Sequence, residues 1–568
     1  MTITTAKLAR AIARAYGRPL ALPLALPLTL GALMLAPAAR AAAEPPVSAP
    51  TAVPESLPAW TPNQTLATGQ VEARAAVLPP ARPRLFTFTF DVRETWSDNV
   101  ALRSEGAERS SLVTELVPGV RLRHKGPRLV LNGQFDYHYY KMTSDIPGTR
   151  DSSRMLRADA KAALVQDLFY LDGNASIQNQ AISAFGQDTN GNDYATANRS
   201  EVRAWRFSPY LVHRFGSFAS GELRYARDSV DAGHAGFGNS TGDTYSARLN
   251  NGRRYHDLGW SLALSRQHID DEIRNDSTIR TANLNLSYKL SRTFNLLGGV
   301  GYDGYDYQSL GGANGGKSWN AGFGWTPGPR TSVQMTAGHR YYGPSRTLSA
   351  LHRSRHTSWS INYDDTVSTT RANFLIPSAV DTAALLDGLF LPNFPDPDER
   401  ARAVEAYIRQ NNLPPSLLDS INYFSNRYML QKQLRASMAY RGAKSGAVIS
   451  VYKLRRDALS VRETDSVLLG NSLNTLNDNV KQQGIAATLS YRLSARTNLS
   501  LIASTSDNES LTTGFKYRNN VLRLSGRHQL GAHTTATLEL RHLKGNTGST
   551  VASPYAENAV AATLSMQL

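Results

Sequence analysis

Side chains that could perform chemistry are sparse in this sequence and rarely stand together. Residues 188–193 read Asp-Thr-Asn-Gly-Asn-Asp and offer oxygen ligands at alternate positions, as calcium loops do. The segment lacks the later glutamate that completes an EF-hand site, and the same residue types favour exposed turns. His352 and His356 would share a helical face, but they lie in a strand-like pattern near a turn. We therefore expect no metal site and no cofactor.

Patterns typical of enzymes are equally weak. The chain has no cysteine, which rules out a thiolate nucleophile, a thiolate metal site and a disulfide framework. Its histidines are dispersed and form no H-E-x-x-H pair. A serine hydrolase stays an alternative because serines are numerous. We expect no enzyme and no catalytic residues.

Charged side chains recur at alternate positions, opposite apolar neighbours, along many segments. If these segments are strands, the alternation places the charges of each segment on one face. The charged positions that follow this pattern are Arg206, Arg214, Glu222, Arg224, Lys289, Arg435, Arg492, Arg523, Arg527, Glu539 and Arg541.

The stretch 483–504 shows what kind of strand would position them. Its first arm alternates apolar residues such as Leu489 with polar ones such as Ser490, and a tight turn leads into a second alternating arm. Residues 286–293 nearly repeat residues 489–497. Because apolar residues at alternate positions suffice to face lipid, this recurring hairpin is typical of a transmembrane β-barrel.

The same alternation continues from residue 85 to the end and predicts about 22 antiparallel strands. Connections after even-numbered strands are short, whereas those after odd-numbered strands are mostly longer and richer in Asp, Asn and Gly. Bacterial barrels have short periplasmic turns and longer outer loops, so this parity agrees with a barrel. The strands should start near residues 85, 111, 127, 153, 166, 200, 217, 241, 255, 276, 292, 315, 331, 344, 357, 425, 444, 480, 496, 515, 532 and 554.

A barrel in lipid also determines where the charged positions point. Charge on the lipid face costs roughly 2–4 kcal/mol at mid-bilayer, so the charged residues named above should line the lumen. A lining of mixed Arg and Glu can fill and rigidify a lumen, whereas a net basic lining can attract an anionic polymer. The sequence leaves both alternatives open.

Two prolines interrupt the strand pattern. Pro118 and Pro209 fall where the ladder needs a backbone N–H, and a closed barrel has no free edge to accommodate them. We therefore expect bulges or kinks at both positions.

One connection differs from the rest, because the alternation stops between residues 371 and 422. Residues 396–399 read as an N-cap, a first-turn proline and an acidic first turn. Apolar residues then recur at helical spacing from Ala401 to Ile408, and residues 382–390 are a second helix candidate. By strand parity this helical insert lies on the outer side or folds into the lumen, where it would plug so wide a barrel.

The beginning of the chain predicts export. Residues 1–43 combine a basic start, an apolar core interrupted by prolines and small residues at a cleavage site, as signal peptides do. Residues 44–84 are rich in proline, which indicates a flexible or PPII-like periplasmic linker, with partner docking as an alternative. The predicted domains are thus a signal peptide (1–43), a linker (44–84) and an outer-membrane barrel (85–568) of a Gram-negative cell, with the insert at 371–422.

Composition agrees with this interpretation without deciding it. The chain has 568 residues and a formal net charge of +16, and its mean hydropathy is −0.36. A low average is compatible with a barrel, because only alternate residues face lipid. Lys and Arg are scattered rather than clustered, so we expect no nucleic-acid partner.

Several segments resemble a known family. Residues 95–100 (Thr-Trp-Ser-Asp-Asn-Val), 200–217 and 413–437 are similar to outer-membrane β-barrel proteins associated with PEP-CTERM/exosortase and exopolysaccharide loci. The resemblance implies an outer-membrane location and a link to surface polysaccharide or sorted proteins, and it carries no catalytic residues. The alternation from Val560 to Leu568 is similar to the terminal strand signal of outer-membrane proteins, which implies the barrel-assembly machinery as a partner.

Two functions follow as hypotheses. The first is a porin-like pore or conduit, accessory to the export of exopolysaccharide or surface-sorted material, with lipid and polysaccharide as partners. The second is a plugged structural or assembly barrel whose outer loops and proline-rich linker bind partners. An outer-membrane hydrolase is a third, weaker alternative.

Overall fold

The computed structural model describes residues 85–568 except 188–191, 197, 233–238, 273–275, 308, 311–312, 376–380, 392–393, 395, 411–426, 461–478 and 548–553. Contacts divide the chain into Met1–Ala59 and Trp60–Leu568, and all the described residues belong to the second unit. The predicted signal peptide (1–43) and linker (44–84) lie outside the described residues.

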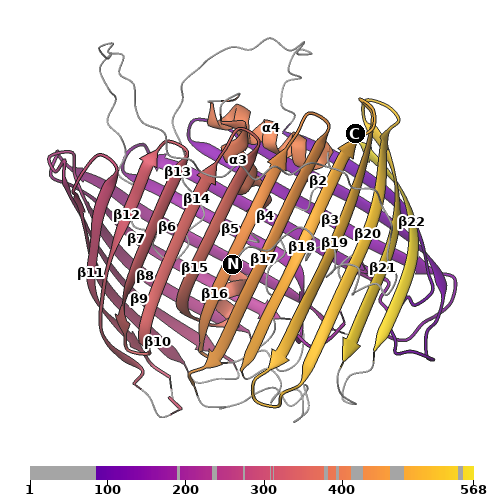
Figure 1. Ribbon diagram of the computed structural model, residues 1–568, viewed down its shortest axis with the longest axis horizontal. Coiled ribbons are helices and arrows are strands. Elements are labelled where there is room, and N and C mark those ends of the chain that lie inside the picture. Colours follow the sequence, from indigo (N-terminus) through magenta and orange to yellow (C-terminus); the bar gives the residue numbers. More distant parts are fainter. Residues whose placement is uncertain are drawn as a thin grey trace, which may run out of the picture. The chain divides into compact units, whose positions relative to one another are not determined.

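The strands form one closed antiparallel barrel (Figure 1). Each strand pairs with its neighbours in sequence, and β1 also pairs with β22, which closes the 22-stranded sheet. The strands are β1 (Phe86–Ser97), β2 (Ser111–Lys125), β3 (Leu129–Met142), β4 (Ser152–Val165), β5 (Phe169–Ala181), β6 (Arg199–Phe215), β7 (Ala219–Ala232), β8 (Ser240–Asn251), β9 (Leu258–Asp271), β10 (Ser277–Lys289), β11 (Phe294–Tyr305), β12 (Gly315–Gly328), β13 (Thr331–Arg340), β14 (Gly343–Arg353), β15 (Thr357–Ser368), β16 (Met429–Arg441), β17 (Ser445–Ala458), β18 (Val480–Arg492), β19 (Thr497–Ser510), β20 (Lys516–Gln529), β21 (Thr534–Thr547) and β22 (Tyr555–Gln567).

The fold class and the strand number predicted from the sequence are confirmed. The largest discrepancy in a predicted strand start is at β16, expected near residue 425 and observed at Met429. Connections after even-numbered strands are short, and the long ones all follow odd-numbered strands. The short connections and both barrel termini therefore share the periplasmic end, and the long loops share the outer end.

Alternation gives the sheet an apolar outward face and a polar inward face. Large apolar side chains that stand opposite polar ones, such as Leu286 on β10 and Leu489 on β18, are about half exposed. Such a continuous apolar outer surface is what a barrel presents to lipid. Among the described residues, no helix combines the length and the apolar character needed to cross a membrane.

Of the bulge or kink predicted at each of the two prolines, the bulge is wrong. Pairing between β2 and β3 lapses beside Pro118 and resumes in the same register, and pairing between β6 and β7 does the same beside Pro209. On their other sides, Pro118 pairs with Phe90 and Pro209 pairs with Leu171 without a shift. The missing N–H therefore removes local pairing on one side of the strand and leaves the register intact.

The connection between β15 and β16 contains helices α2 (Thr370–Leu375), α3 (Asp381–Phe390) and α4 (Pro397–Gln410). The predicted N-cap of α4 is confirmed, because the Glu399 N–H donates to Asp396 Oδ1 at 2.8 Å. Helix α3 also agrees with the predicted candidate, whereas α2 was not predicted. The expected apolar stripe needs one correction: Ala401 is exposed, and Ala403 and Tyr407 pack instead with Val404 and Ile408.

Candidate functional site in the barrel interior

The strand register places every charged residue singled out in the sequence on the inward face. Arg206, Glu222 and Arg224 share the wall of β6 and β7, and Arg523, Glu539 and Arg541 share that of β20 and β21. The others stand on the inward face nearer the periplasmic end or on other strands, namely Arg214 on β6, Lys289 on β10, Arg435 on β16, Arg492 on β18 and Arg527 on β20.

On the wall of β5–β7, Arg224 is a centre of polar contacts. Its guanidinium donates to Glu222 at 2.8 Å, to Asp172 at 3.1 Å and to Ser208 at 3.0 Å. It also lies over the Tyr210 ring, 3.8 Å from the centroid. These neighbours neutralise the arginine, so this part of the wall has little free positive charge to offer an anionic polymer.

A second ionic cluster joins β1 to β20–β22. The Glu539 carboxylate lies 3.3 Å from Arg93, 3.4 Å from Arg523 and 3.9 Å from Arg541. Arg541 also donates to both oxygens of Glu557, at 3.1 and 3.2 Å, and both of these side chains are buried. The charges at the closure of the barrel therefore form a paired network.

The loop between β5 and β6 folds onto this cluster. Asn192 donates to Glu557 at 2.9 Å and accepts from Arg541. The loop therefore supplies one hydrogen-bond partner to each side chain of the buried Arg541–Glu557 ion pair. Ser97, at the end of β1, donates to the same carboxylate at 2.7 Å. Asn192 belongs to the calcium candidate, whose residues 188–191 lie outside the described residues, and it is engaged in this protein network.

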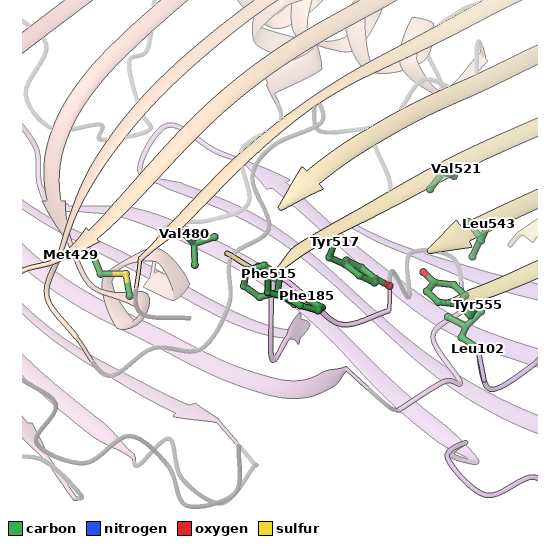
Figure 2. Packing of buried hydrophobic residues seen from close by; sticks show 10 residues of the cluster. Leu102, Phe185, Met429, Val480, Phe515, Tyr517, Val521, Leu543 and Tyr555 are labelled. Atoms are coloured by element: carbon green, nitrogen blue, oxygen red, sulfur yellow. The ribbon is translucent and has the colours of Figure 1, made fainter. Parts of the chain in front are cut away.

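Apolar contacts hold the same loop against the opposite wall. Figure 2 shows Phe185 of the β5–β6 loop beside Phe515, with their ring centroids 5.6 Å apart. Leu102 of the β1–β2 loop lies beside Tyr555 at the other end of the cluster. The cluster comprises Leu102, Ala184, Phe185, Met429, Val480, Phe515, Tyr517, Val521, Leu543 and Tyr555. Loops from two places in the chain thus pack on inward-facing residues toward the outer ends of β16, β18 and β20–β22.

Helix α2 packs against the inward face of β6 and β7. Arg371 forms an ion pair with Asp228, and these side chains are only 2% and 1% exposed. Its Nε donates to Ser240 at 2.8 Å, while Phe374 packs with Val202 and Val230. The connection that leaves β15 therefore reaches a wall eight to nine strands earlier in the chain, so α2 lies inside the barrel.

Ser240 also bears on the hydrolase alternative. Residues 238–242 read Gly-Asn-Ser-Thr-Gly, the spacing of a hydrolase nucleophile elbow. An elbow serine stands on a sharp turn from a strand into a helix. Ser240 instead begins β8, is buried, and accepts the hydrogen bond from Arg371. Its position identifies it as an anchor for α2.

Helices α3 and α4 pack against the inward face of β16 and β17. Leu386, Leu389 and Val404 form an apolar cluster with the inward-facing Ala439 and Val448. The cluster is closed by polar contacts: Arg400 donates to Asp387 at 2.6 Å, and the Arg441 guanidinium lies 4.0 Å from the centroid of the Phe390 ring. The sequence left two positions for the insert, and the structure places it on the inward side.

The wall formed by β9–β14 is different, because its middle carries no charge. In these strands, all of whose residues are described, the inward-facing charged side chains are near strand ends: Asp271, Lys289, Asp303, Arg340 and Arg353. Between them most inward positions hold hydroxyl, amide or glycine residues, interrupted by apolar ones such as Ala263, Ile279 and Leu297. The polar and glycine positions include Ser265, Gln267, Thr281, Asn283, Asn285, Ser287, Gly299, Gly301, Ser318, Asn320, Gln334, Thr336, Thr347 and Ser349. We call this surface the uncharged wall.

Glycines give the uncharged wall its form. A Cβ added at Gly299 would lie 2.8 Å from the side-chain amides of both Asn285 and Asn320. The side-chain amides of Asn285 and Asn320 therefore occupy the space that a side chain at position 299 would fill. A Cβ at Gly301 would similarly meet Asn283 and Ser318. Rows of amide and hydroxyl groups thus lie close to the sheet, where they can exchange hydrogen bonds with a polar ligand.

Tyrosines gather at the outer end of this wall. Tyr307 stacks on Tyr428 with centroids 4.7 Å apart, and Tyr305 lies 5.4 Å from Tyr341. The Tyr307 and Tyr341 hydroxyls are 3.4 Å apart. Burial raises the pKa of Tyr341, so its phenol stays neutral over the physiological range. The outer end therefore adds aromatic faces and neutral hydroxyls.

A possible metal cluster lies outside the lumen. Within the described part of the chain, the only group with metal-ligand spacing is His268, Asp270 and Asp276, at the outer end of β9 and β10. It is largely exposed, as acidic groups without a metal commonly are. The histidines considered in the sequence bind protein groups instead: His352 contacts Thr331 at 2.9 Å and His356 contacts the Arg441 carbonyl at 3.2 Å.

We call the β5–β6 loop and the helices α2, α3 and α4 the plugging segments. Sequence reasoning did not identify the wall residues that anchor α2 and the β5–β6 loop. Asp228 and Glu557 stand at inward strand positions, so their alternation could have placed them on the inward face beside the arginines. Their partners, Arg371 and Asn192, belong to connections, where no periodicity predicts what a side chain will contact.

Comparisons with known proteins find only distant structural likenesses. No protein-family model and no curated protein match the chain. The siderophore receptor PirA from Pseudomonas aeruginosa is 9% identical over 86% of this chain and 81% of that chain, with a TM-score of 0.43. The FrpB iron transporter from Neisseria meningitidis (F5-1 variant) is 9% identical over 86% and 82%, with a TM-score of 0.47. The outer membrane protein opdK from Pseudomonas aeruginosa is 8% identical over 85% and 99%, with a TM-score of 0.32.

The location follows from the architecture itself. A sheet that closes on itself leaves no unpaired edge, and its outward face is apolar along alternate positions. Closed barrels of this kind satisfy all backbone hydrogen bonds in lipid and are found in bacterial outer membranes. The chain is an outer-membrane β-barrel.

Proposed function

We propose that this barrel is a conduit accessory to the export of exopolysaccharide or surface-sorted material, and that its plugging segments regulate passage. The uncharged wall is the observation that carries the proposal. Selectivity in a pore depends on the hydrogen-bonding groups and charges that line it. A polysaccharide needs many weak, exchangeable hydrogen bonds to its hydroxyls, and the side chains of β9–β14 offer them.

Charge pairing at three positions favours an uncharged polymer. An anionic polymer would need free cations along its path, and three of the lumen arginines, Arg224, Arg523 and Arg541, are instead paired with acidic side chains. The uncharged wall and the tyrosines at its outer end present neutral donors, acceptors and ring faces. The association with exopolysaccharide itself rests on the family resemblance in the sequence.

A plugged structural barrel is the second candidate. It is favoured by the buried contacts of the plugging segments, such as the Arg371–Asp228 ion pair. In that case the loops would be permanent parts of the wall, and partners would bind at the outer surface. The two candidates differ in whether the interior opens.

Conductance of the purified protein in planar bilayers distinguishes them. Deleting residues 381–412 removes α3 and α4 together with the contacts to Ala439 and Val448. For a conduit we expect higher single-channel conductance and partial block by a neutral gluco-oligosaccharide, with weaker block by a uronate oligosaccharide of equal length. A folded deletion variant that conducts no more than the wild type would support the structural barrel.

A matched pair of variants tests the wall itself. In the deletion background, Asn283→Ala with Asn285→Ala should weaken the sugar block severalfold, because two amides are lost from the uncharged wall. Ser525→Ala, at a buried inward position on β20, should leave the block unchanged. Equal effects of the two changes would contradict a path along β9–β14.

A further inference from the structure

Two arginines stand side by side on the outward face of the barrel. Arg266 on β9 and Arg280 on β10 are directly paired in the register, and both side chains are exposed. Like charges directly opposite each other on adjacent strands destabilise a sheet. The position therefore favours a bound group that supplies negative charge.

A second pair of opposed cations on the outward face has acidic neighbours. Arg455 stands opposite Lys481, but Arg455 donates to Asp457 at 2.9 Å and Lys481 lies 3.2 Å from Glu509. Among the residues that the structure describes, no acidic side chain lies within ion-pair distance of the guanidinium of Arg266 or Arg280. This contrast singles out β9 and β10, which are neighbours in Figure 1.

The surroundings place the arginine pair at the lipid headgroups. Arg266 is also paired with the exposed Tyr245, and aromatic side chains of this kind mark the membrane interface. From Tyr288 up to Arg280, β10 rises roughly 27 Å, or roughly 21 Å along the barrel axis at a tilt of about 40°. That is close to the upper edge of an apolar band about 25 Å tall.

An aromatic ring borders the pair on the neighbouring strand. Arg280 stands opposite Gly304 of β11, and a Cβ added at Gly304 would lie 3.3 Å from the ring of the exposed Tyr302. Below the arginines, the outward positions Leu264 and Leu284 are apolar and exposed, so acyl chains can lie against them. Forked guanidinium groups suit phosphate, which they bind through pairs of charge-assisted hydrogen bonds.

We propose that Arg266 and Arg280 form a binding site for a phosphate group of a phosphorylated glycolipid in the outer leaflet. The phosphate accepts hydrogen bonds from both guanidinium groups and relieves their repulsion. The acyl chains of the same lipid cover the apolar outward face of β9 and β10. This site lies outside the barrel and is independent of what passes through it.

The test compares lipid binding by the full-length mature protein purified in detergent. The probes are bis-phosphorylated lipid A and the same lipid A after chemical dephosphorylation. The double variant Arg266→Gln/Arg280→Gln should bind lipid A roughly tenfold more weakly than the wild type. Arg518→Gln is the matched control, because Arg518 is an exposed outward cation paired with Asp507 at 2.5 Å, and it should stay within about twofold of the wild type.

Thermal unfolding gives a second readout that a misfolded variant could not mimic. Without lipid A, the double variant should unfold at the same temperature as the wild type or higher, because a repulsion has been removed. With lipid A, the wild type should gain thermal stability and the double variant should not. Two outcomes would overturn the proposal. One is that the wild type and the double variant bind lipid A equally well, and the other is that the wild type binds dephosphorylated lipid A as tightly as lipid A.

Discussion

The inward face of this barrel has two regions built from the same kind of strand. From β20 through β1 to β7, charged side chains meet in networks around Glu539, Glu557 and Arg224. From β9 to β14 the middle of the wall carries no charge and consists mainly of hydroxyl, amide and glycine residues. Helix α2 and the β5–β6 loop anchor on charged residues of the first region, at Asp228 and Glu557, whereas α3 and α4 pack on β16 and β17 through apolar contacts.

The difference teaches how a wide barrel can be filled on one side without filling the other. A buried charge is tolerated only with a well-placed partner, so Asp228 and Glu557 each specify which segment docks on them. Neutral hydroxyls and amides offer many bonds of similar strength and specify no single partner. Charge therefore directs α2 and the β5–β6 loop to one region, and the uncharged wall offers no comparable anchor.

The largest expected effect comes from breaking the anchor of α2. Replacing Arg371 by Leu leaves Asp228 buried without its cation, which costs about 3–5 kcal/mol. We expect α2 to leave the wall of β6 and β7 and the conductance of the purified barrel to rise. Single-channel recording in planar bilayers measures this.

A double replacement serves as the control for this prediction. Arg371→Met combined with Asp228→Leu removes both charges and fills the site with apolar side chains, which is neutral or stabilising in comparable ion pairs. Conductance should then return toward that of the wild type. If Arg371→Leu alone conducts like the wild type, the ion pair does not control the plug.

The second-largest effect tests which residues of β10 face lipid and which face the lumen. Leu286→Arg places a charge on the lipid face of β10, at a cost of roughly 2–4 kcal/mol near mid-bilayer, and should prevent assembly. Ser287→Arg, one residue later, points inward opposite Gly259 and should be tolerated. The measurement is the amount of heat-modifiable, folded barrel in the outer-membrane fraction.

The Leu286→Arg and Ser287→Arg variants test the register more sharply than Leu489→Arg and Ser490→Arg on β18 would. Ser490 also faces inward, but it is buried and donates to the Gly446 carbonyl at 3.3 Å, close to Tyr407 of α4. An arginine there would disturb the insert as well as the wall. Equal tolerance of Leu286→Arg and Ser287→Arg would mean that the assigned register is displaced by one residue.

Local periodicity explains why so much of the fold was predictable. Alternation over each strand predicts which residues face inward, so Arg224 and Arg541 could be placed on the polar face before their partners were known. The prolines were misjudged because a strand can lose pairing at Pro118 on one side and keep its register on the other. Helix α2 has six residues, too few for helical spacing to emerge.

The docking of the plug could not be predicted in the same way. The contacts of Arg371 with Asp228 and of Asn192 with Glu557 join residues far apart in sequence, across the barrel interior. The local sequence pattern of a loop does not predict which part of the barrel wall the loop will contact. The uncharged wall was likewise missed, because attention to charged residues gives no weight to a run of Ser, Thr, Asn and Gly.

The smallest expected effect separates the two regions by pH. In the β5–β6 loop, burial alone would raise the pKa of Asp193, but the Arg199 guanidinium, helped by His138 and Arg150, holds this pKa below its ordinary value of 3.8. A carboxylate with a lowered pKa stabilises the docked loop above its undocked pKa, and that stabilisation is lost as the pH falls through the docked pKa. The loop should therefore stay docked near neutrality and loosen progressively only below about pH 4.

Because the natural chain has no cysteine, a single introduced thiol can report on each region. An environment-sensitive dye on Thr196→Cys, in the β5–β6 loop, should change its emission as the pH falls from about 6 to about 3, and Asp193→Asn should abolish that change. The same dye on Thr336→Cys should respond little, because Thr336 stands on the uncharged wall, where its hydroxyl is 2.6 Å from that of Thr347. A transition at the same pH in both positions, or one that persists in Asp193→Asn, would show that acid acts on the whole barrel, and the contrast between the two regions would then not extend to their response to pH.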